Sequence, residues 1–190
     1  MWGESIKYKI PSLTVDIFIY NENHEFILIQ RKNPPFKDSW ALPGGFVDYG
    51  ETTEDAAIRE AKEETSIDIE SVELFGVYSE PDRDPRRHTV SIVYLAHGNF
   101  DDAKADDDAN DIGVFSFDVL KEKELAFDHA KILSEVKEHL EKTDWFLNKF
   151  FQKNCKFFSI FQSTNNLFLL LFFTKFLQFF LIFRRFLPYF

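Results

Sequence analysis

A glycine turn followed by a short acidic helix is the feature that most limits how this chain can fold. Gly44-Gly45 opens the turn, and residues 59–65 then read Arg-Glu-Ala-Lys-Glu-Glu-Thr. Thr52, with Asp55 three positions later, is typical of a helix start, so we expect a helix from there to about residue 65. The backbone must therefore turn tightly, through residues without side chains, shortly before it presents a row of acids.

The segments around this helix predict an α/β fold. Runs rich in β-branched and aromatic residues indicate strands, and apolar residues at helical spacing indicate a second helix over residues 128–143. The expected strands cover residues 13–20, 25–31, 69–79, 89–97 and 112–117. Strands and helices in this order predict an α/β/α sandwich, in which helices cover both faces of a mixed sheet.

Two segments between these elements are expected to be irregular. Residues 40–43 lead into Gly44-Gly45, where proline and glycine disfavour a regular strand. Residues 101–111 are rich in aspartate and are expected to form an acidic loop. Neither segment is therefore assigned to the predicted sheet.

The charge distribution separates a strongly acidic body from a basic tail. The formal charge of −10 divides into −16 for residues 1–144 and +6 for residues 145–190. So acidic a body repels nucleic acid backbones, and no nucleic acid partner is expected. The single cysteine, Cys155, excludes an internal disulfide and a multi-cysteine zinc site. The chain also starts without the apolar run behind a basic segment that marks a signal peptide, so we expect a cytoplasmic protein.

The Phe-rich apolar tail, residues 145–190, is expected to lie outside a first domain of residues 1–144. It holds 15 of the 24 phenylalanines and no acidic residue. Its most apolar stretch, residues 167–183, is shorter than the roughly 20 residues that a membrane span needs, and it contains Lys175. Three interpretations stay open: a membrane span, a helix that packs on a partner or a membrane surface, and an extension that is not part of the native protein.

Three glutamates share one face of the expected helix. At about 100° per residue, Glu60, Glu63 and Glu64 fall within one arc, whereas Ala61 and Thr65 face another side. Carboxylates this close repel one another unless a cation lies among them. Hard oxygen ligands favour Mg²⁺, with Mn²⁺ as the alternative. The competing interpretation is a solvated acidic face with i,i+4 charge pairs.

Neighbouring residues add to this pattern. Glu51, at the N-terminal edge of the helix, is within reach of Arg59, which can fix the rotamer of a carboxylate. A backbone carbonyl of the Gly44-Gly45 turn can supply a further metal ligand, because glycine lets the backbone come close. The sequence therefore predicts a metal site built from both the turn and the helix.

The whole arrangement resembles the signature of the Nudix hydrolases. Gly45 is followed after five residues by Glu51, and after seven more by Arg-Glu-Ala-Lys-Glu-Glu. The resemblance implies a Nudix fold and metal-dependent hydrolysis of a nucleoside diphosphate linked to another moiety. The metal ligands that it implies are Glu60, Glu64, Glu63 and Gly45. The residues that it implies in catalysis are Glu63, Arg59 and Glu51. Ser66 stands where the family usually has glycine, a departure that concerns the turn after the helix.

The loop at residues 79–88 is the best guide to the substrate. It carries three arginines and a histidine on a proline-containing segment before a strand. Arginine can bind two phosphate oxygens at once. The expected substrate contacts are Arg83, Arg86 and His88, together with Arg31 at a strand end. The alternative is a surface loop in which the arginines pair with the aspartates beside them.

This loop resembles the corresponding segment of the ADP-ribose pyrophosphatases, and so do residues 127–130, Phe-Asp-His-Ala. Residues 107–109 match the acidic loop in which that subgroup can place a catalytic carboxylate. The resemblance implies Mg²⁺-dependent cleavage of ADP-ribose to AMP and ribose 5-phosphate, with a small nucleotide as the partner and a homodimer as a frequent assembly. The alternatives are a pyrophosphatase for modified nucleoside triphosphates or dinucleotides, and a non-catalytic regulator that senses ADP-ribose.

Aromatic and histidine side chains near these motifs have a structural alternative. Tyr8, Phe18 and Trp40 have rings able to stack on adenine, but core packing is the role we expect for each. His88 and His129 are expected to be hydrogen-bond partners within the fold more than catalysts.

Overall fold

The fold is seen in a computed structural model, which describes residues 9–101, 103, 109–120 and 123–143. The chain divides into two compact units, Met1–Glu138 and His139–Phe190. The first unit contains the sheet and the candidate site. Of the second, the structure describes residues 139–143, which are helical. No helix within the described ranges is long and apolar enough to cross a membrane, and the tail at residues 145–190 lies outside those ranges.

The described part of the first unit contains seven strands, which all belong to one sheet. They are β1 (Ser12–Tyr20), β2 (Phe26–Arg31), β3 (Trp40–Ala41), β4 (Gly44–Phe46), β5 (Glu73–Tyr78), β6 (Thr89–His97) and β7 (Ala109–Phe115). The main order is β3-β2-β1-β6-β5, while β4 pairs with β1 and β7 pairs with β2. β1 runs parallel to β6, from Ser12 opposite Thr89 to Tyr20 opposite His97. The other pairings between these strands are antiparallel, so the predicted mixed sheet is confirmed.

Helix α1 (Thr53–Thr65) begins and ends close to the predicted residues. Thr52 is its N-cap, and the Thr52 hydroxyl accepts a hydrogen bond of 3.1 Å from the backbone N–H of Asp55. This bond satisfies one of the amides that a helix start leaves without a partner. The helix ends at Ser66, which has left-handed backbone angles (φ 60°, ψ 6°) and donates its N–H to Lys62 O at 2.9 Å.

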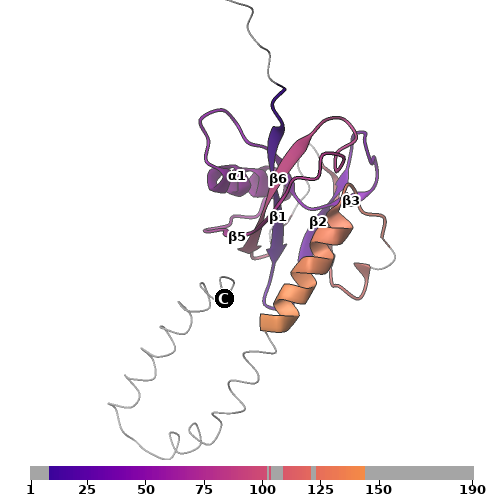
Figure 1. Cartoon of the computed structure of the whole chain (residues 1–190). Coiled ribbons are helices and arrows are strands. Elements are labelled where there is room, and N and C mark those ends of the chain that lie inside the picture. The colour runs from indigo at the N-terminus through magenta and orange to yellow at the C-terminus, as the bar shows by residue number, and fades with distance from the viewer. Residues whose placement is uncertain (1–8, 102, 104–108, 121–122, 144–190) are drawn as a thin grey trace, which may run out of the picture. The chain divides into compact units, whose positions relative to one another are not determined.

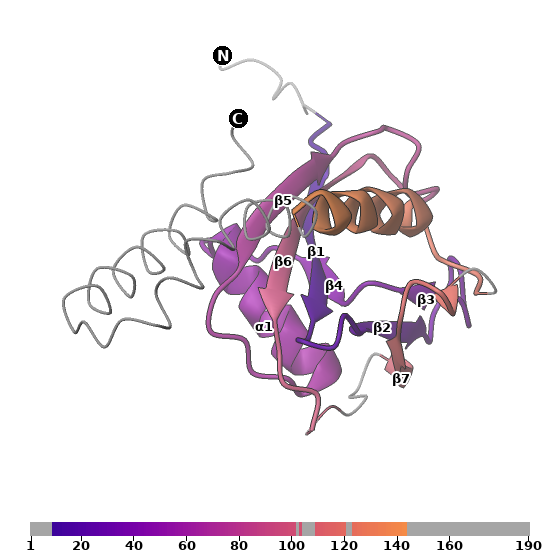
Figure 2. The same ribbon diagram turned by 90° about the horizontal axis from the view of Figure 1, so that it is seen from below.

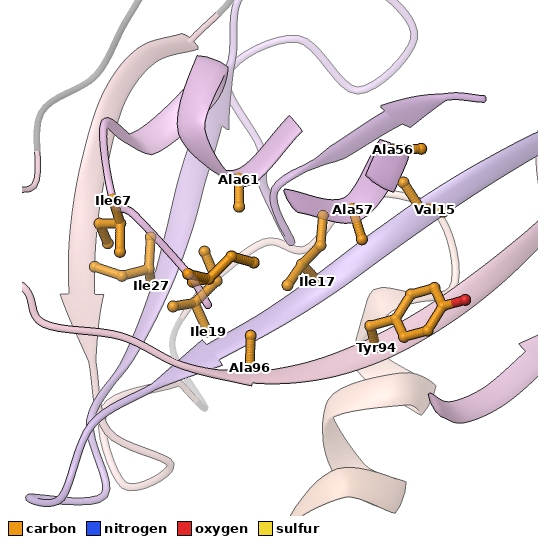
Figure 3. Close-up of a cluster of buried hydrophobic side chains, with 11 residues drawn as sticks. Val15, Ile17, Ile19, Ile27, Ala56, Ala57, Ala61, Ile67, Tyr94 and Ala96 are labelled. Carbon is orange, nitrogen blue, oxygen red and sulfur yellow. The ribbon is translucent and has the colours of Figure 1, made fainter. Parts of the chain in front are cut away.

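One face of the sheet packs against α1. Ala56, Ala57 and Ala61 are fully buried, and they point toward alternate side chains of β1 (Figure 3). Because successive residues of a strand point to opposite faces, Val15, Ile17 and Ile19 all face this cluster. The small alanines let the helix lie close to the sheet, which brings its acidic face near the glycine turn.

The other face of the sheet is covered by residues 129–138, the part of the helix at residues 129–143 that belongs to the first unit. Ile132, Leu133 and Val136 are almost completely buried, at the spacing that predicted the helix. Figures 1 and 2 show α1 and the start of this helix on opposite sides of the sheet. The Tyr78 hydroxyl on β5 donates to Glu135 Oε2 at 2.6 Å. The expected α/β/α sandwich is therefore confirmed.

The segment expected to be irregular at residues 40–45 contains two short strands, so that expectation was wrong. β4 pairs with β1, with Gly44 opposite Asp16 and Gly45 opposite Val15. Pro43 falls between β3 and β4, where its carbonyl accepts from Ile17 N at 2.8 Å. Glycine and proline interrupt the apolar pattern of a strand without preventing backbone pairing over two or three residues.

Two strand boundaries also differ from the prediction. β7 begins at Ala109, three residues earlier than expected, because Ala109 and Asp111 pair through their backbone with β2. Acidic side chains do not prevent that pairing. β5 begins at Glu73, not at residue 69, and Ile69 is buried in the core beside α1. Ile69 is apolar because it packs in the core, although it lies in a loop and not in a strand.

Candidate active site

Arg59 binds three of the glutamates that the motif brings together. Its Nε and Nη2 donate to the two carboxylate oxygens of Glu51 at 2.8 and 2.9 Å. Its Nη1 donates to Glu60 at 2.7 Å and to Glu63 at 3.1 Å. The Arg59 hydrogen bonds hold the pKa of Glu51 down at about 2. Arg59 also donates to Phe46 O at 3.1 Å, so it ties α1 to the glycine turn.

Glu60 is more deeply buried than Glu63, with 13% of its side chain exposed against 58% for Glu63. Burial raises the pKa of Glu60, and the hydrogen bond from Arg59 acts in the opposite direction. A partly dehydrated carboxylate is costly in its charged form unless a cation compensates it. Arg59 already compensates part of this cost, and a metal ion bound at the same carboxylate would compensate more of it.

The two glycines of the turn allow the acids to approach the backbone. Gly44 N donates to Glu64 Oε2 at 2.8 Å. A Cβ on Gly45 would overlap the carboxylate of Glu60, and one on Gly44 would overlap Val15 O. Only glycine fits at these two positions without movement of the neighbouring atoms. The close contact between the turn and the helix acids therefore depends on both glycines.

These groups face a cavity of about 330 Å³. The cavity is lined from β1, β2, the glycine turn, α1, the loop before β6 and the start of the helix at residues 129–143. Its lining residues are Thr14, Asp16, Ile29, Arg31, Lys32, Asn33, Pro34, Ala41, Leu42, Gly44, Gly45, Phe46, Glu60, Glu64, Arg83, Asp84, Arg86, Thr89, Phe127 and His129.

Two of the predicted substrate contacts, Arg31 and Arg86, lie beside the ring of Phe127. Their guanidinium carbons are 4.8 and 5.8 Å from its centroid. Arg86 also pairs with the buried carboxylate of Asp84, with Nη2 to Oδ2 at 2.8 Å. Arginines that rest on an aromatic ring lose less freedom on binding an anion. This side of the cavity can therefore receive phosphate groups.

Arg83 lines the same cavity, but its charge is engaged by buried carboxylates. Its side chain is 4% exposed. It donates to both carboxylate oxygens of Asp128, at 3.0 and 2.6 Å, and lies 3.4 Å from Asp16 Oδ2. Arg83 thus links the loop before β6 to the segment that precedes the helix at residues 129–143.

Other predicted residues lie elsewhere. Glu51, Arg59 and Glu63 do not line the cavity, although Arg59 connects them to Glu60. His88 is exposed and outside the cavity lining, and its carbonyl accepts from Ser12 N at 3.0 Å.

The aromatic residues follow the structural expectation where they are described. Phe18 is 1% exposed and lies in the core, as predicted. Trp40 packs edge-on against Phe115, with ring centroids 4.7 Å apart. Tyr8 and the acidic residues 107–108 lie outside the described residues.

Sequence reasoning missed several polar residues of the cavity, including Asp16, Asp84 and Thr89. Asp16 left a recognisable signal, because it is a lone acid within the apolar strand Val15–Ile19. It is 8% exposed and accepts a hydrogen bond from Ser91 Oγ. The significance of Asp84 depended on its burial, which its sequence neighbours do not reveal.

The donor set fits a hard divalent cation. Glu60 and Glu64 line the cavity, and Gly45 brings its backbone beside Glu60. Among the described residues no three His, Cys, Asp or Glu side chains already converge on one point. A cation would therefore be held by oxygen atoms from both the helix and the turn, as Mg²⁺ or Mn²⁺ prefers.

A mixed sheet between helices, with a glycine turn facing glutamates and an arginine-lined cavity beside them, is the arrangement of a hydrolase of phosphate anhydrides whose acids suit a divalent cation. The model of the NUDIX domain family matches residues 11–136. The chain belongs to the Nudix family and is a Nudix hydrolase.

Within this family the chain is similar to ADP-ribose pyrophosphatases. It is 47% identical over 132 residues to the ADP-ribose pyrophosphatase of Methanocaldococcus jannaschii, a match that covers 68% of this chain and 76% of that protein. A bifunctional NMN adenylyltransferase/ADP-ribose pyrophosphatase from Francisella tularensis, crystallised with AMP and a manganese ion, has a TM-score of 0.64 at 32% identity. That match covers 70% of this chain and 43% of the other.

A similar fold also occurs in a regulator. The NUDIX domain of Shewanella oneidensis NrtR, complexed with ADP-ribose, has a TM-score of 0.67 at 26% identity. The match covers 73% of this chain and 94% of that domain. The repressor NtrR of Acinetobacter baylyi is 39% identical over 98 residues, which are 49% of this chain and 39% of the repressor.

Proposed function

We propose that this protein is a Mg²⁺-dependent ADP-ribose pyrophosphatase that cleaves ADP-ribose to AMP and ribose 5-phosphate. One observation carries the proposal: a single cavity is lined by Glu60 and Glu64 and also by Arg31 and Arg86. The acids suit a metal ion, and the arginines suit the phosphates of a diphosphate substrate. The similarity to the Methanocaldococcus enzyme supports ADP-ribose as the substrate.

In this proposal each residue has a separate role. Glu60, Glu64 and the Gly45 carbonyl hold the metal, with Glu63 as a further ligand or as the base. When bound, the metal supplies charge neutralisation for the diphosphate and a more acidic water. Arg59 keeps the carboxylates of Glu60 and Glu63 in place through its hydrogen bonds of 2.7 and 3.1 Å.

Substrate binding falls to the arginine side of the cavity. Arg31 and Arg86 bind phosphate oxygens, and the ring of Phe127, beside which both guanidinium groups lie, limits their movement. Arg83 contributes mainly by fixing the loop, because its Nε and Nη2 already donate to the carboxylate of Asp128. His88 stays a candidate contact for a part of the substrate that extends beyond the cavity.

A non-catalytic sensor of ADP-ribose is the second candidate function. The likeness to the NrtR domain and to the NtrR repressor favours it. The intact set of Glu60, Glu63 and Glu64 favours hydrolysis, since binding alone needs no row of metal-binding acids. The two functions differ in turnover, so a product assay separates them.

The test is a substrate panel with the purified full-length chain and Mg²⁺ or Mn²⁺. ADP-ribose, dinucleotides and nucleoside triphosphates are compared, and the products are identified by chromatography and mass spectrometry. We expect AMP and ribose 5-phosphate from ADP-ribose, at the highest kcat/KM of the panel. Faster cleavage of another substrate, or binding of ADP-ribose without turnover, contradicts the proposal.

The control for this test is Glu64→Gln, which should remove most turnover. Glutamine keeps a carbonyl oxygen for the hydrogen bond from Gly44 N but loses the negative charge. We expect kcat to fall by about 100-fold or more with an unchanged melting temperature. Glu70→Gln, at an exposed position outside the cavity, should leave kcat unaffected. Full activity of Glu64→Gln would remove Glu64 from the metal site.

We further propose a cytoplasmic location and a homodimeric assembly. The single cysteine, which fits a reducing compartment, supports the first. The second rests on the resemblance to the ADP-ribose pyrophosphatases. Cell fractionation and light scattering of the purified chain test these two proposals.

A further inference from the structure

We propose that His129 is a positioning residue, which holds the glycine turn where it can meet the acids of α1. The inference rests on the proposed function in one respect, namely that turn and helix together hold the metal. His129 lies more than sixty residues beyond α1 and belongs to no part of the glycine-acid motif. The structure connects it to that motif through the backbone.

The first connection is the hydrogen bond from Leu42 N to His129 Nδ1, at 2.9 Å. His129 is 2% exposed and Leu42 is also 2% exposed, so water does not replace this acceptor easily. Since Nδ1 accepts a hydrogen bond from the Leu42 N–H, it carries no proton itself, and the neutral ring has its proton on Nε2. The imidazole is thus used as a fixed acceptor.

The next two residues after Leu42 are also anchored. Pro43 O accepts from Ile17 N at 2.8 Å, and Gly44 N donates to Glu64 Oε2 at 2.8 Å. Leu42, Pro43 and Gly44 are therefore each fixed by a backbone hydrogen bond. Together these bonds connect His129 to Glu64. A shift of the backbone at Leu42 reaches a candidate metal ligand within two peptide units.

The far side of the imidazole is held as well. His129 Nε2 lies 3.6 Å from Asp16 Oδ1. Asp16 is itself fixed by Ser91 Oγ and by Arg83, and it stands opposite Gly44 in the pairing of β1 with β4. A carboxylate on this side favours the tautomer with its proton on Nε2, which leaves Nδ1 available to Leu42.

Two substitutions at position 129 separate this role from simple packing. In asparagine, Oδ1 is as many bonds from Cα as Nδ1 is in histidine, so His129→Asn retains an acceptor near the same place. His129→Leu fills similar space without an acceptor. His97→Asn, an exposed position on β6 outside the cavity, is the matched control.

Activity and metal binding are measured for each variant. We expect His129→Leu to lower kcat by about 10- to 100-fold and to weaken Mn²⁺ binding, followed by electron paramagnetic resonance, by about tenfold. KM for ADP-ribose should change by less than about threefold, because Arg31 and Arg86 are untouched. His129→Asn should recover kcat and Mn²⁺ affinity to within about threefold of wild type.

The contrary outcomes are distinct. If His129→Asn is folded but as impaired as His129→Leu, or if folded His129→Leu binds Mn²⁺ and turns over normally, the proposal is overturned. Should both variants fail to fold, the nitrogen NMR spectrum of the wild-type imidazole decides. An unprotonated Nδ1 supports the proposal, and a protonated Nδ1 refutes it.

Failure of the proposed function gives a different result. A wild-type chain that does not cleave ADP-ribose disproves the substrate assignment. The Mn²⁺ affinities and the NMR spectrum still report on His129 in that case, because neither depends on turnover.

Discussion

At the scale of single residues, three arginines of one loop have different surroundings. Arg83 is buried and paired with Asp128, Arg86 lines the cavity beside Phe127, and Arg87 is exposed outside it. The sequence presents them as equivalent cations. Their burial and partners divide them into a residue that fixes the loop, a candidate phosphate contact and a surface residue.

Arg86→Ala should raise KM for ADP-ribose by roughly tenfold or more, because a charge-assisted hydrogen bond to phosphate is worth about 1.5–3 kcal/mol. Arg87→Ala is the matched control and should leave KM within about twofold of wild type. Steady-state kinetics with both variants tests this division. Equal effects of the two substitutions would show that the cavity side of the loop has no special role.

Gly45→Ala should inactivate the enzyme without unfolding it. The added methyl group meets the mobile end of Glu60, not fixed backbone, so the carboxylate is displaced and the fold survives. We expect kcat to fall by about 100-fold with a small change in melting temperature. Gly76→Ala is the control, because the nearest atom to a Cβ added at Gly76 is 3.5 Å away, and its kcat should be unchanged. Normal turnover of Gly45→Ala would separate Gly45 from the site.

At the scale of elements, α1 follows local rules at both ends. Its first turn has the expected Thr52 cap, and its last turn ends in a left-handed residue, where glycine is usual. Here that residue is Ser66. The departure from the family pattern therefore changes the cost of the turn and leaves its geometry intact, as the hydrogen bond from Ser66 N to Lys62 O shows.

Ser66→Gly should stabilise the protein by roughly 1 kcal/mol, since a residue with a Cβ is strained at this left-handed conformation. Thermal unfolding of both proteins measures the change. Ser134→Gly, at an exposed position in the helix at residues 129–143, should instead cost about 0.5 kcal/mol. A destabilised Ser66→Gly would mean that the serine side chain contributes to the cap.

At the scale of the whole first unit, a buried polar network joins distant segments. Ser91 on β6 contacts Asp16 on β1, and Asp16 contacts Arg83 in the loop before β6 and His129 at the start of the helix at residues 129–143. Arg83 in turn contacts Asp128. Removing one partner of such a pair is costly because a buried charge is left uncompensated. The network thus aligns the loop, the sheet and the helix around the cavity.

This network makes stability depend on pH. Burial lowers the pKa of His129 below its usual 6.5, while the charges of Asp16 and Asp128 oppose that shift and those of Arg83 and Arg31 add to it. Well above pH 6.5 the ring is neutral in both folded and unfolded chains. Below pH 6.5 the unfolded chain takes up the proton first, so the free energy of unfolding falls as the pH falls.

We expect this loss to be smaller in His129→Asn than in the wild type between pH 7 and pH 5. The difference in slope should be at most about 1.4 kcal/mol per pH unit. Carboxylates with a lowered pKa, such as Asp84 and Glu51, lose their contribution only at more acidic pH, near and below their unfolded values. Urea unfolding at a series of pH values measures the curves. Parallel curves for the two proteins would contradict the prediction.

Much of the fold could be predicted because its signals are local. The cap at Thr52, the helical spacing of Ile132, Leu133 and Val136, and the alternation in β1 each depend on residues a few positions apart. β3 and β4 could not be predicted, because a strand of two or three residues has no periodicity of its own. Their existence depends on β1 and β2 as partners.

The sequence by itself determined the acidic helix, the glycine turn before it and the existence of the five longer strands, since spacing along one element sets which side chains share a face. Only the tertiary structure decided which residues meet across the cavity. Arg83 donates a hydrogen bond to Asp128, 45 positions away in the sequence, and Leu42 donates one to His129, 87 positions away. Such pairs leave no periodic pattern in the sequence, because their residues meet only when the sheet packs between the two helices.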